Sequence, residues 1–294
     1  MKIALTNWQL ATFARRQLPR DTEVTVAKGL KCTTQITLSP KLERQSDFEV
    51  NFQTKRYYLS IESKENKIIT NIKFTKIGKL GRYLSDGYSN NHILYYLTIL
   101  FPIFLSEISR DTSLLPFHAT VIRYENKNLA FLGEPGAGKS SVARIASKYG
   151  GLIQSDNFTL ISENHYQGLR SPIRFSDVDS TFQEPILQVK KDLFEVSYGD
   201  NEFTNGKIHK VIYLAKGENY ETRDLDSRDL QETIWRDLIS APEYKLFMEI
   251  LLKSKILQIS DRVRRKFDFE FSIKQLPIGA FDKHQENKTW QYLI

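Results

Sequence analysis

A glycine-rich loop followed by lysine and serine carries the clearest chemistry in this sequence. Residues 133–140 read GEPGAGKS and match the phosphate-binding pattern G-x-x-x-x-G-K-[ST] at every fixed position. Its glycines permit backbone angles that turn successive N–H groups towards one anion. Lys139 can meet the β- and γ-phosphates of a nucleotide, and the Ser140 hydroxyl can bind Mg²⁺. We predict that ATP or GTP binds with Mg²⁺ through Gly133, Glu134, Pro135, Gly136, Ala137, Gly138, Lys139, Ser140 and Ser141.

The residues around the loop favour the same interpretation. An apolar strand pattern precedes it at 128–132, and a helical pattern begins at Lys139. The positive end of such a helix would face the phosphates. The pattern alone does not name a reaction, because GTPase switches, motors, small-molecule kinases and nucleotide-binding regulators all use it.

An aspartate follows the loop at a spacing that suits catalysis. Asp156 lies 17 residues after Lys139, and the helix and strand between them would return the chain to the phosphates. We predict that the strand at 151–155 runs beside the loop strand and ends at Asp156. A carboxylate there could hold Mg²⁺ through water or take a proton from an attacking hydroxyl. The alternative is that Asp156 and Asn157 only form a turn between strands.

A histidine precedes the loop in the run Phe-His-Ala-Thr. We predict that His118 begins a strand that pairs with the loop strand. In that place it could hydrogen-bond Asp156 or a phosphate. The alternative is a structural histidine whose hydrogen bonds serve only the fold.

The elements that must position these residues fall into two parts with a boundary near residue 112. Residues 1–112 combine a short helix at 6–17, β-rich sequence over 33–75 and an apolar helix at 90–109, which Pro102 should kink or break. We therefore expect a smaller β-rich α+β domain that binds a substrate or partner.

The second predicted domain, residues 113–294, contains the glycine-rich loop. Strand patterns outnumber helices, and the later part predicts helices at 221–239 and 244–263 and a strand at 267–273. We expect an α/β domain of the α+β kind, with helices packed on a mixed sheet.

The first domain carries the whole excess of positive charge. Residues 1–112 contain 17 Lys and Arg against 10 Asp and Glu, whereas residues 113–294 contain 25 of each. Such an excess attracts an acidic peptide, a nucleic acid or a phosphorylated ligand. The alternative is a solvated basic face without a specific partner, because the charges are dispersed.

The sequence also gives an expectation for location. Its first 20 residues contain no apolar stretch of the kind found in signal peptides, and the longest apolar run, 92–105, is short for a bilayer and contains Pro102. A lone cysteine, Cys32, suits a reducing compartment. We expect a cytoplasmic protein without a membrane span, and we include a homo-oligomer among its expected states.

Residues 114–162 resemble the catalytic domain of HPr kinase/phosphorylase and its kinase-like relatives. That family shows a His followed by a small residue, a hairpin into the phosphate loop, a helix, and a strand that ends in Asp-Asp. The pair stands 17 and 18 residues after the loop lysine. His118, Lys139, Ser140 and Asp156 fall into this register. The resemblance weakens towards residue 217 and is absent over 1–110.

The resemblance implies a role for each matching residue. Asp156 would take the proton from an acceptor hydroxyl, and His118 would orient it. Ser140, together with Asp156 and Asn157, would hold Mg²⁺. The family fold is related to phosphoenolpyruvate carboxykinase, which implies a mixed sheet. Relatives with an unrelated N-terminal domain include kinases of peptide natural-product pathways, whose acceptor is often a Ser hydroxyl.

Two departures limit what the resemblance implies. Asn157 stands where the family has its second aspartate, so that this position brings no charge to a metal. The Gly-rich Glu-Arg segment of true HPr kinases is also missing from the sequence. The resemblance therefore does not extend to phosphorylase activity or to HPr as the substrate.

Three functions follow from these observations. The first is an enzyme that moves the γ-phosphoryl group of ATP or GTP to a hydroxyl of a peptide, protein or small molecule. The second is a non-catalytic or slowly hydrolysing nucleotide-binding regulator of a partner protein. The third, a nucleic-acid-binding NTPase, rests only on the basic first domain. Nucleotide turnover that depends on an acceptor separates the first from the second.

Replacement of the loop lysine tests the phosphate-binding interpretation. Lys139→Ala removes the charge that would meet the β- and γ-phosphates, so we expect Mg-ATP binding to weaken or turnover to stop. Titration with Mg-ATP and a turnover assay measure this. A folded variant with unchanged affinity and turnover would rule out the interpretation.

Overall fold

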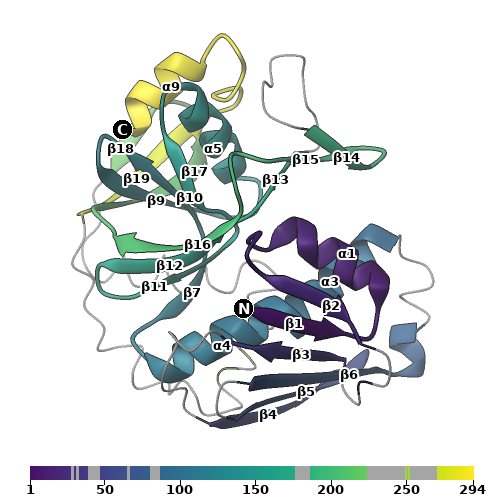
Figure 1. Cartoon of the computed structure of the whole chain (residues 1–294). Coiled ribbons are helices and arrows are strands. Elements are labelled where there is room, and N and C mark those ends of the chain that lie inside the picture. The colour runs from purple at the N-terminus through teal and green to yellow at the C-terminus, as the bar shows by residue number, and fades with distance from the viewer. Residues whose placement is uncertain are drawn as a thin grey trace. The chain divides into compact units, whose positions relative to one another are not determined.

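The computed structural model divides the chain into two compact units (Figure 1). One unit comprises Met1–Leu114 and Glu249–Arg264, and the other comprises Leu115–Met248 and Arg265–Ile294. The structure describes residues 1–27, 30, 33–38, 47–64, 67–79, 87–175, 186–223, 249, 251 and 270–294.

The first unit contains a six-stranded mixed sheet. Its strand order is β2-β1-β3-β6-β5-β4, with β1 and β2 parallel and the other neighbours antiparallel. Helix α1 (Trp8–Gln17) connects the parallel pair, and the Asn7 side chain caps it by accepting hydrogen bonds from the N–H groups of Gln9 and Leu10. The strands are β1 (Lys2–Leu5), β2 (Glu23–Val26), β3 (Thr34–Thr37), β4 (Phe48–Gln53), β5 (Tyr57–Lys64) and β6 (Lys67–Phe74).

The apolar helix of the first unit changes its hydrogen bonding just before its proline. Helix α3 (Gly87–Tyr95) continues into a π-helical turn, η1 (Tyr96–Leu100), and then into α4 (Phe101–Arg110). Pro102 was expected to kink or break the helix. The helix does not break there, because the backbone stays right-handed helical at Leu100 and Phe101. A wider turn accommodates the missing N–H group of proline without ending the helix.

The same helix is long enough to cross a membrane. The 20 residues Asn91–Arg110 meet this requirement by length and composition, and the shorter apolar run 92–105 lies within them. However, 78% of its most apolar stretch is buried inside the protein. A core helix passes the same test, so the finding does not indicate a membrane span.

The second unit is built around another six-stranded mixed sheet, of order β10-β8-β9-β17-β19-β18. Strands β9, β17 and β19 are parallel, as expected for a mixed sheet. Apolar residues of this sheet form one core cluster with helices α5 (Lys139–Lys148) and α9 (Glu286–Leu293). The strands are β8 (Thr120–Tyr124), β9 (Lys127–Leu132), β10 (Leu152–Ser155), β17 (Lys210–Gly217), β18 (Glu221–Arg223) and β19 (Glu270–Pro277).

Two antiparallel sheets complete the described part of the second unit. One has the order β16-β12-β11-β7 and the other β13-β15-β14. They are formed by β7 (Leu115–His118), β11 (Phe158–Ile161), β12 (His165–Arg170), β13 (Ile173–Phe175), β14 (Ile186–Lys190), β15 (Leu193–Val196) and β16 (Glu202–Lys207).

Three predictions about local structure are wrong. His118 ends β7 in one sheet, and a new strand, β8, starts at Thr120 in another. Strand β10 pairs with β8 and not with the loop strand β9. Residues 221–223, predicted as helix, form β18 because their backbone completes the sheet edge beside β19. Cys32 and nearly all of the predicted helices beyond residue 223 lie outside the described residues.

A buried glutamate fastens the last helix to the helix after the loop. The Glu286 side chain is 2% exposed and accepts hydrogen bonds from Arg144 and from Lys148 (2.7 Å). Burial raises the pKa of Glu286, but the bonds from Lys148 and Arg144 lower it by more than burial raises it. The net pKa therefore lies below its ordinary value. The ion pairs therefore stabilise the folded state at neutral pH.

Glu286→Gln should lower the free energy of unfolding by about 2 kcal/mol at pH 7, because it leaves two cations beside an uncharged buried side chain. The folded-state pKa is depressed, so this contribution exists above the unfolded pKa near 4.5 and disappears as the pH falls through the folded pKa. Urea unfolding of both proteins at pH 7 and at lower pH measures the difference. Glu270→Gln is the control, since Glu270 pairs with Lys210 but is 66% exposed. Equal effects of the two substitutions would contradict the prediction.

Candidate functional site

The glycine-rich loop joins the end of β9 to the start of α5 and curves through three unusual backbone angles. The φ angles of Gly133, Gly136 and Gly138 are 145°, 81° and 99°. Side chains with a Cβ atom rarely adopt such angles, which explains the glycines at these positions. The loop residues Glu134 and Pro135 are exposed, and Ser140 and Ser141 are half-buried in the first turn of α5.

The lysine of the motif is bound to its own loop. Lys139 is only 6% exposed, and its Nζ donates hydrogen bonds to the carbonyl oxygens of Gly133 and Glu134 (3.0 Å). These bonds close the loop around the ammonium group. They also compensate for the burial of a charged group, which is unfavourable without partners.

Two glycines of the loop are also required by close packing. A Cβ atom on Gly138 would lie 2.1 Å from the Phe281 ring, and one on Gly133 would lie 2.7 Å from the carbonyl oxygen of Leu214. A Cβ atom on Gly136 would meet nothing within 4 Å. Phe281, whose carbonyl accepts a bond from Arg144 (3.1 Å), thus supports the loop. No sequence pattern points to Phe281, because it follows the loop by more than 140 residues and belongs to no motif.

The aspartate predicted as catalytic is buried at the carboxyl end of β10. Asp156 is 4% exposed. Its Oδ1 accepts a hydrogen bond from the Thr120 hydroxyl at 2.5 Å, and its Oδ2 accepts one from the Asn157 amide at 2.8 Å. Burial raises the pKa of Asp156, and the bonds with Thr120 and Asn157 and the charge of Lys139 offset only part of this. The expected neighbour relation with β9 is wrong, but β10 and β9 run in the same direction with β8 between them.

The histidine is linked to this aspartate through Asn157. His118 forms a side-chain hydrogen bond with Asn157, which in turn donates to Asp156. Burial and the positive charge of Lys139 lower the pKa of His118 to about 3, while the bond with Asn157 raises it slightly. The imidazole is therefore neutral at physiological pH. His118 was expected to bond Asp156 or a phosphate, and the bond in the structure goes to Asn157.

These residues lie where the chain passes twice between two sheets. Ala119 connects β7 to β8, and the pair Asp156–Asn157 connects β10 to β11. The two connections are joined by a hydrogen bond from the Ala119 N–H to the Asn157 carbonyl (3.2 Å). Asn157 has a φ of 64°, a left-handed conformation that Asn tolerates better than most residues. Asp156 and Asn157 thus connect two strands, which both the catalytic and the turn interpretation require.

Arg174 is a second cation whose charge acts on Asp156. This residue of β13 lowers the pKa of Asp156, and its Nε lies 3.5 Å from Oε1 of Glu195, which is 3% exposed. Neither Arg174 nor Thr120 was predicted from the sequence. Thr120 carried a weak signal, since it stands two residues after His118, whereas nothing in the sequence distinguishes Arg174.

The donor atoms present suit Mg²⁺ only in combination with a phosphate ligand. Among the described residues, no group of three or more His, Cys, Asp or Glu side chains could hold a metal ion. Ser140 and Asp156 offer a hydroxyl and a carboxylate, the hard oxygen ligands that Mg²⁺ prefers. The Asn157 amide already bonds Asp156 and His118. Phosphate oxygens and water would have to supply the remaining ligands.

Comparisons with known proteins find distant similarity among solved structures only. No protein-family model and no curated protein matches the chain. Among solved structures, the HPr(Ser) kinase/phosphatase from Coxiella burnetii is 16% identical to it, with a match that covers 46% of this chain and 99% of that one. The TM-score is 0.23, so this superposition supports no inference about function.

Alanine substitutions at two loop glycines separate backbone strain from packing. Gly136→Ala should cost about 1 kcal/mol of stability, since only its φ is unfavourable. Gly138→Ala should cost about 3 kcal/mol, because its Cβ also meets Phe281. Denaturant unfolding measures both, and the double variant Gly138→Ala/Phe281→Ala should lose less than the sum of the single variants. Additive losses, or equal losses at Gly136 and Gly138, would refute the packing role of Phe281.

Proposed function

We propose that this protein is a kinase that transfers the γ-phosphoryl group of ATP or GTP to a hydroxyl group, with Ser of a peptide or protein as the preferred acceptor. One observation carries the proposal. A loop with three left-handed glycines and a buried lysine precedes α5, and the charge of that same lysine acts on the buried carboxylate of Asp156. A phosphate cradle and a proton acceptor are the two parts that phosphoryl transfer to a hydroxyl needs.

The loop would bind the nucleotide through its backbone and through Lys139. Left-handed glycines let consecutive N–H groups point at one anion, and the N-terminus of α5 adds its partial positive charge. Lys139 would exchange its bonds with the carbonyls of Gly133 and Glu134 for bonds to phosphate oxygens. Mg²⁺, when bound beside Ser140 and Asp156, would neutralise charge on those oxygens.

Asp156 would accept the proton of the acceptor hydroxyl. Its raised pKa makes it a stronger base than an ordinary carboxylate. Thr120 and Asn157 hold the carboxylate in one orientation, and each carboxylate oxygen still has a further lone pair for an incoming O–H. His118, neutral and bonded to Asn157, would position this amide and so act on Asp156 indirectly.

A nucleotide-binding regulator without phosphoryl transfer is the second candidate. The observation in its favour is that both oxygens of Asp156 already accept hydrogen bonds within the protein. The uncharged Asn157 also leaves one carboxylate where related kinases have two. In this function the same loop binds the nucleotide, and the first unit passes the signal to a partner. Cytoplasmic location and oligomeric state stay predictions from the sequence.

Replacement of Asp156 distinguishes the two functions. Asp156→Asn should leave the fold and Mg-ATP binding nearly unchanged but reduce phosphoryl transfer by about two to four orders of magnitude, the usual effect of a positioned proton acceptor. His118→Ala should reduce transfer less, because its proposed role is indirect. The measurement is nucleotide affinity together with transfer of labelled phosphate to peptide and protein acceptors. Equal transfer rates for the wild type and Asp156→Asn would favour the regulator.

The pH profile gives a second measurement of the same assignment. A base must be deprotonated, so transfer should rise with pH through the raised pKa of Asp156. Thr120→Val removes a hydrogen bond that lowers this pKa, so the acidic limb should move to higher pH. A limb that stays in place would show that Asp156 does not act as the base.

A further inference from the structure

The outer face of strands β4, β5 and β6 in the first unit presents three rows of side chains. Facing residues form the rows Glu49–Glu62–Ile69, Asn51–Ser60–Asn71 and Gln53–Tyr58–Lys73. The alternate residues of these strands, such as Val50 and Leu59, are buried on the other face. Since side chains alternate along a strand, the three rows share one side of the sheet.

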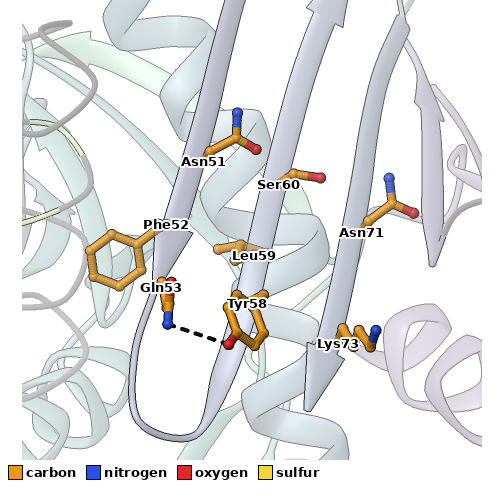
Figure 2. A pocket seen from close by; sticks show the side chains of 8 residues that line it. All are labelled: Asn51, Phe52, Gln53, Tyr58, Leu59, Ser60, Asn71 and Lys73. Carbon is orange, nitrogen blue, oxygen red and sulfur yellow. Dashed lines mark hydrogen bonds between the residues drawn. The ribbon is translucent and has the colours of Figure 1, made fainter. Parts of the chain in front are cut away.

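The second and third rows line a depression of about 360 Å³ (Figure 2). Figure 2 shows Asn51, Ser60 and Asn71 on one side of the three strands, with Gln53, Tyr58 and Lys73 one row below them. The Gln53 amide donates to the Tyr58 hydroxyl (3.3 Å), and Tyr58 is 47% exposed. Three side-chain amides and two hydroxyls thus line the depression, together with the partly exposed aromatic ring of Tyr58.

Positive charge is concentrated at one end of this depression. Lys73 lies in its last row, and exposed basic residues follow in the β4–β5 turn and in the segment after β6: Lys55, Arg56, Lys76 and Lys79. Thr75 ties these two segments together, because its N–H donates to the carbonyl of Arg56 and its hydroxyl donates to that of Lys55 (2.9 and 2.7 Å). We call the five basic residues Lys55, Arg56, Lys73, Lys76 and Lys79 the basic end.

The opposite end of the face has balanced charge. Glu49 and Glu62 face each other there, and Lys64 pairs with Glu62 at 2.6 Å. Lys67 faces Lys64 in the next row. The face therefore changes from cationic to neutral along the strands. It would attract negative charge at one end only.

We propose that this face binds a peptide segment whose acidic residues lie at one end and reach the basic end. Side-chain amides carry one donor and one acceptor group like those of a peptide bond, so Asn51, Gln53 and Asn71 suit a peptide backbone. The basic end suits clustered Asp and Glu side chains. Among the described strands of this sheet, β4 is also the last in order, so its outer edge could offer backbone groups to an extended segment.

A nucleic acid fits the same face less well. Single strands bind through several aromatic platforms combined with charge along the whole groove. Here Tyr58 is the one exposed aromatic residue that lines the depression, and a phosphate chain that crossed the three rows would meet Glu49 and Glu62. Binding of this kind does not require phosphoryl transfer, so the proposal stands apart from the proposed kinase activity.

Two charge reversals on the same strand test the proposal. Lys73→Glu changes the basic end, and Lys67→Glu makes the same change on the same face at the balanced end, about 20 Å away. That separation exceeds the Debye length of about 8 Å at physiological salt, so the two charges act independently. The probes are a fluorescent peptide of Ser, Asn and Val with Asp and Glu at one end, its counterpart with Lys at that end, and a single-stranded oligonucleotide. Anisotropy with the 294-residue chain, without nucleotide, gives each affinity.

We expect the acidic peptide to bind more tightly than the other two probes and its affinity to fall with salt. Lys73→Glu should weaken its binding about tenfold and Lys67→Glu less than about twofold. Tyr58→Ala should weaken it as well, because the depression loses its ring. Equal effects of the two reversals, tighter binding of the oligonucleotide, or no saturable binding of the acidic peptide would each overturn the proposal.

Discussion

The burial of the Asp156 carboxylate is the constraint on which the candidate site depends. A carboxylate removed from water must receive hydrogen bonds or take up a proton. Thr120 and Asn157 supply the bonds, and His118 bonds Asn157. These partners come from β7, β8 and the turn between β10 and β11, so two sheets must meet at this point. The junction of the two sheets thus supplies the hydrogen-bond donors that a buried carboxylate requires, and these bonds fix its position.

The loop meets this junction through charge and backbone geometry. Lys139 lowers the pKa of His118 and opposes the rise at Asp156, so its ammonium group acts on both residues. Its own position depends on the carbonyls of Gly133 and Glu134 and on the packing of Phe281 against Gly138. Phe281 lies just before helix α9, which Glu286 fastens to α5. Residues at the end of the described chain thereby support a loop near its middle.

Local patterns predicted the elements nearest to the loop well. The strand before it, the helix from Lys139 and the mixed sheet follow from runs of apolar residues and from glycine, whose physics is local. Pairing of strands is not local. A sequence pattern predicts that 117–124 is extended, but it does not show that the chain changes sheets at Ala119 or that β8 lies between β10 and β9. The sequence pattern of Glu221–Arg223 likewise predicts a helix, but these residues form a strand because they pair with β19 at the edge of the sheet.

The sequence by itself determined the chemical inventory: a phosphate-binding pattern at 133–140, an aspartate 17 residues later, and an excess of basic residues before residue 112. Only the tertiary structure decided which groups act on one another. It placed Asn157 between His118 and Asp156, brought the charge of Arg174 to bear on Asp156, and gathered part of the dispersed basic charge at one end of a sheet face. The physical reason is that hydrogen bonds and charge interactions act over a few ångströms in space. Residues distant in sequence come that close only when strand pairing and core packing bring them together.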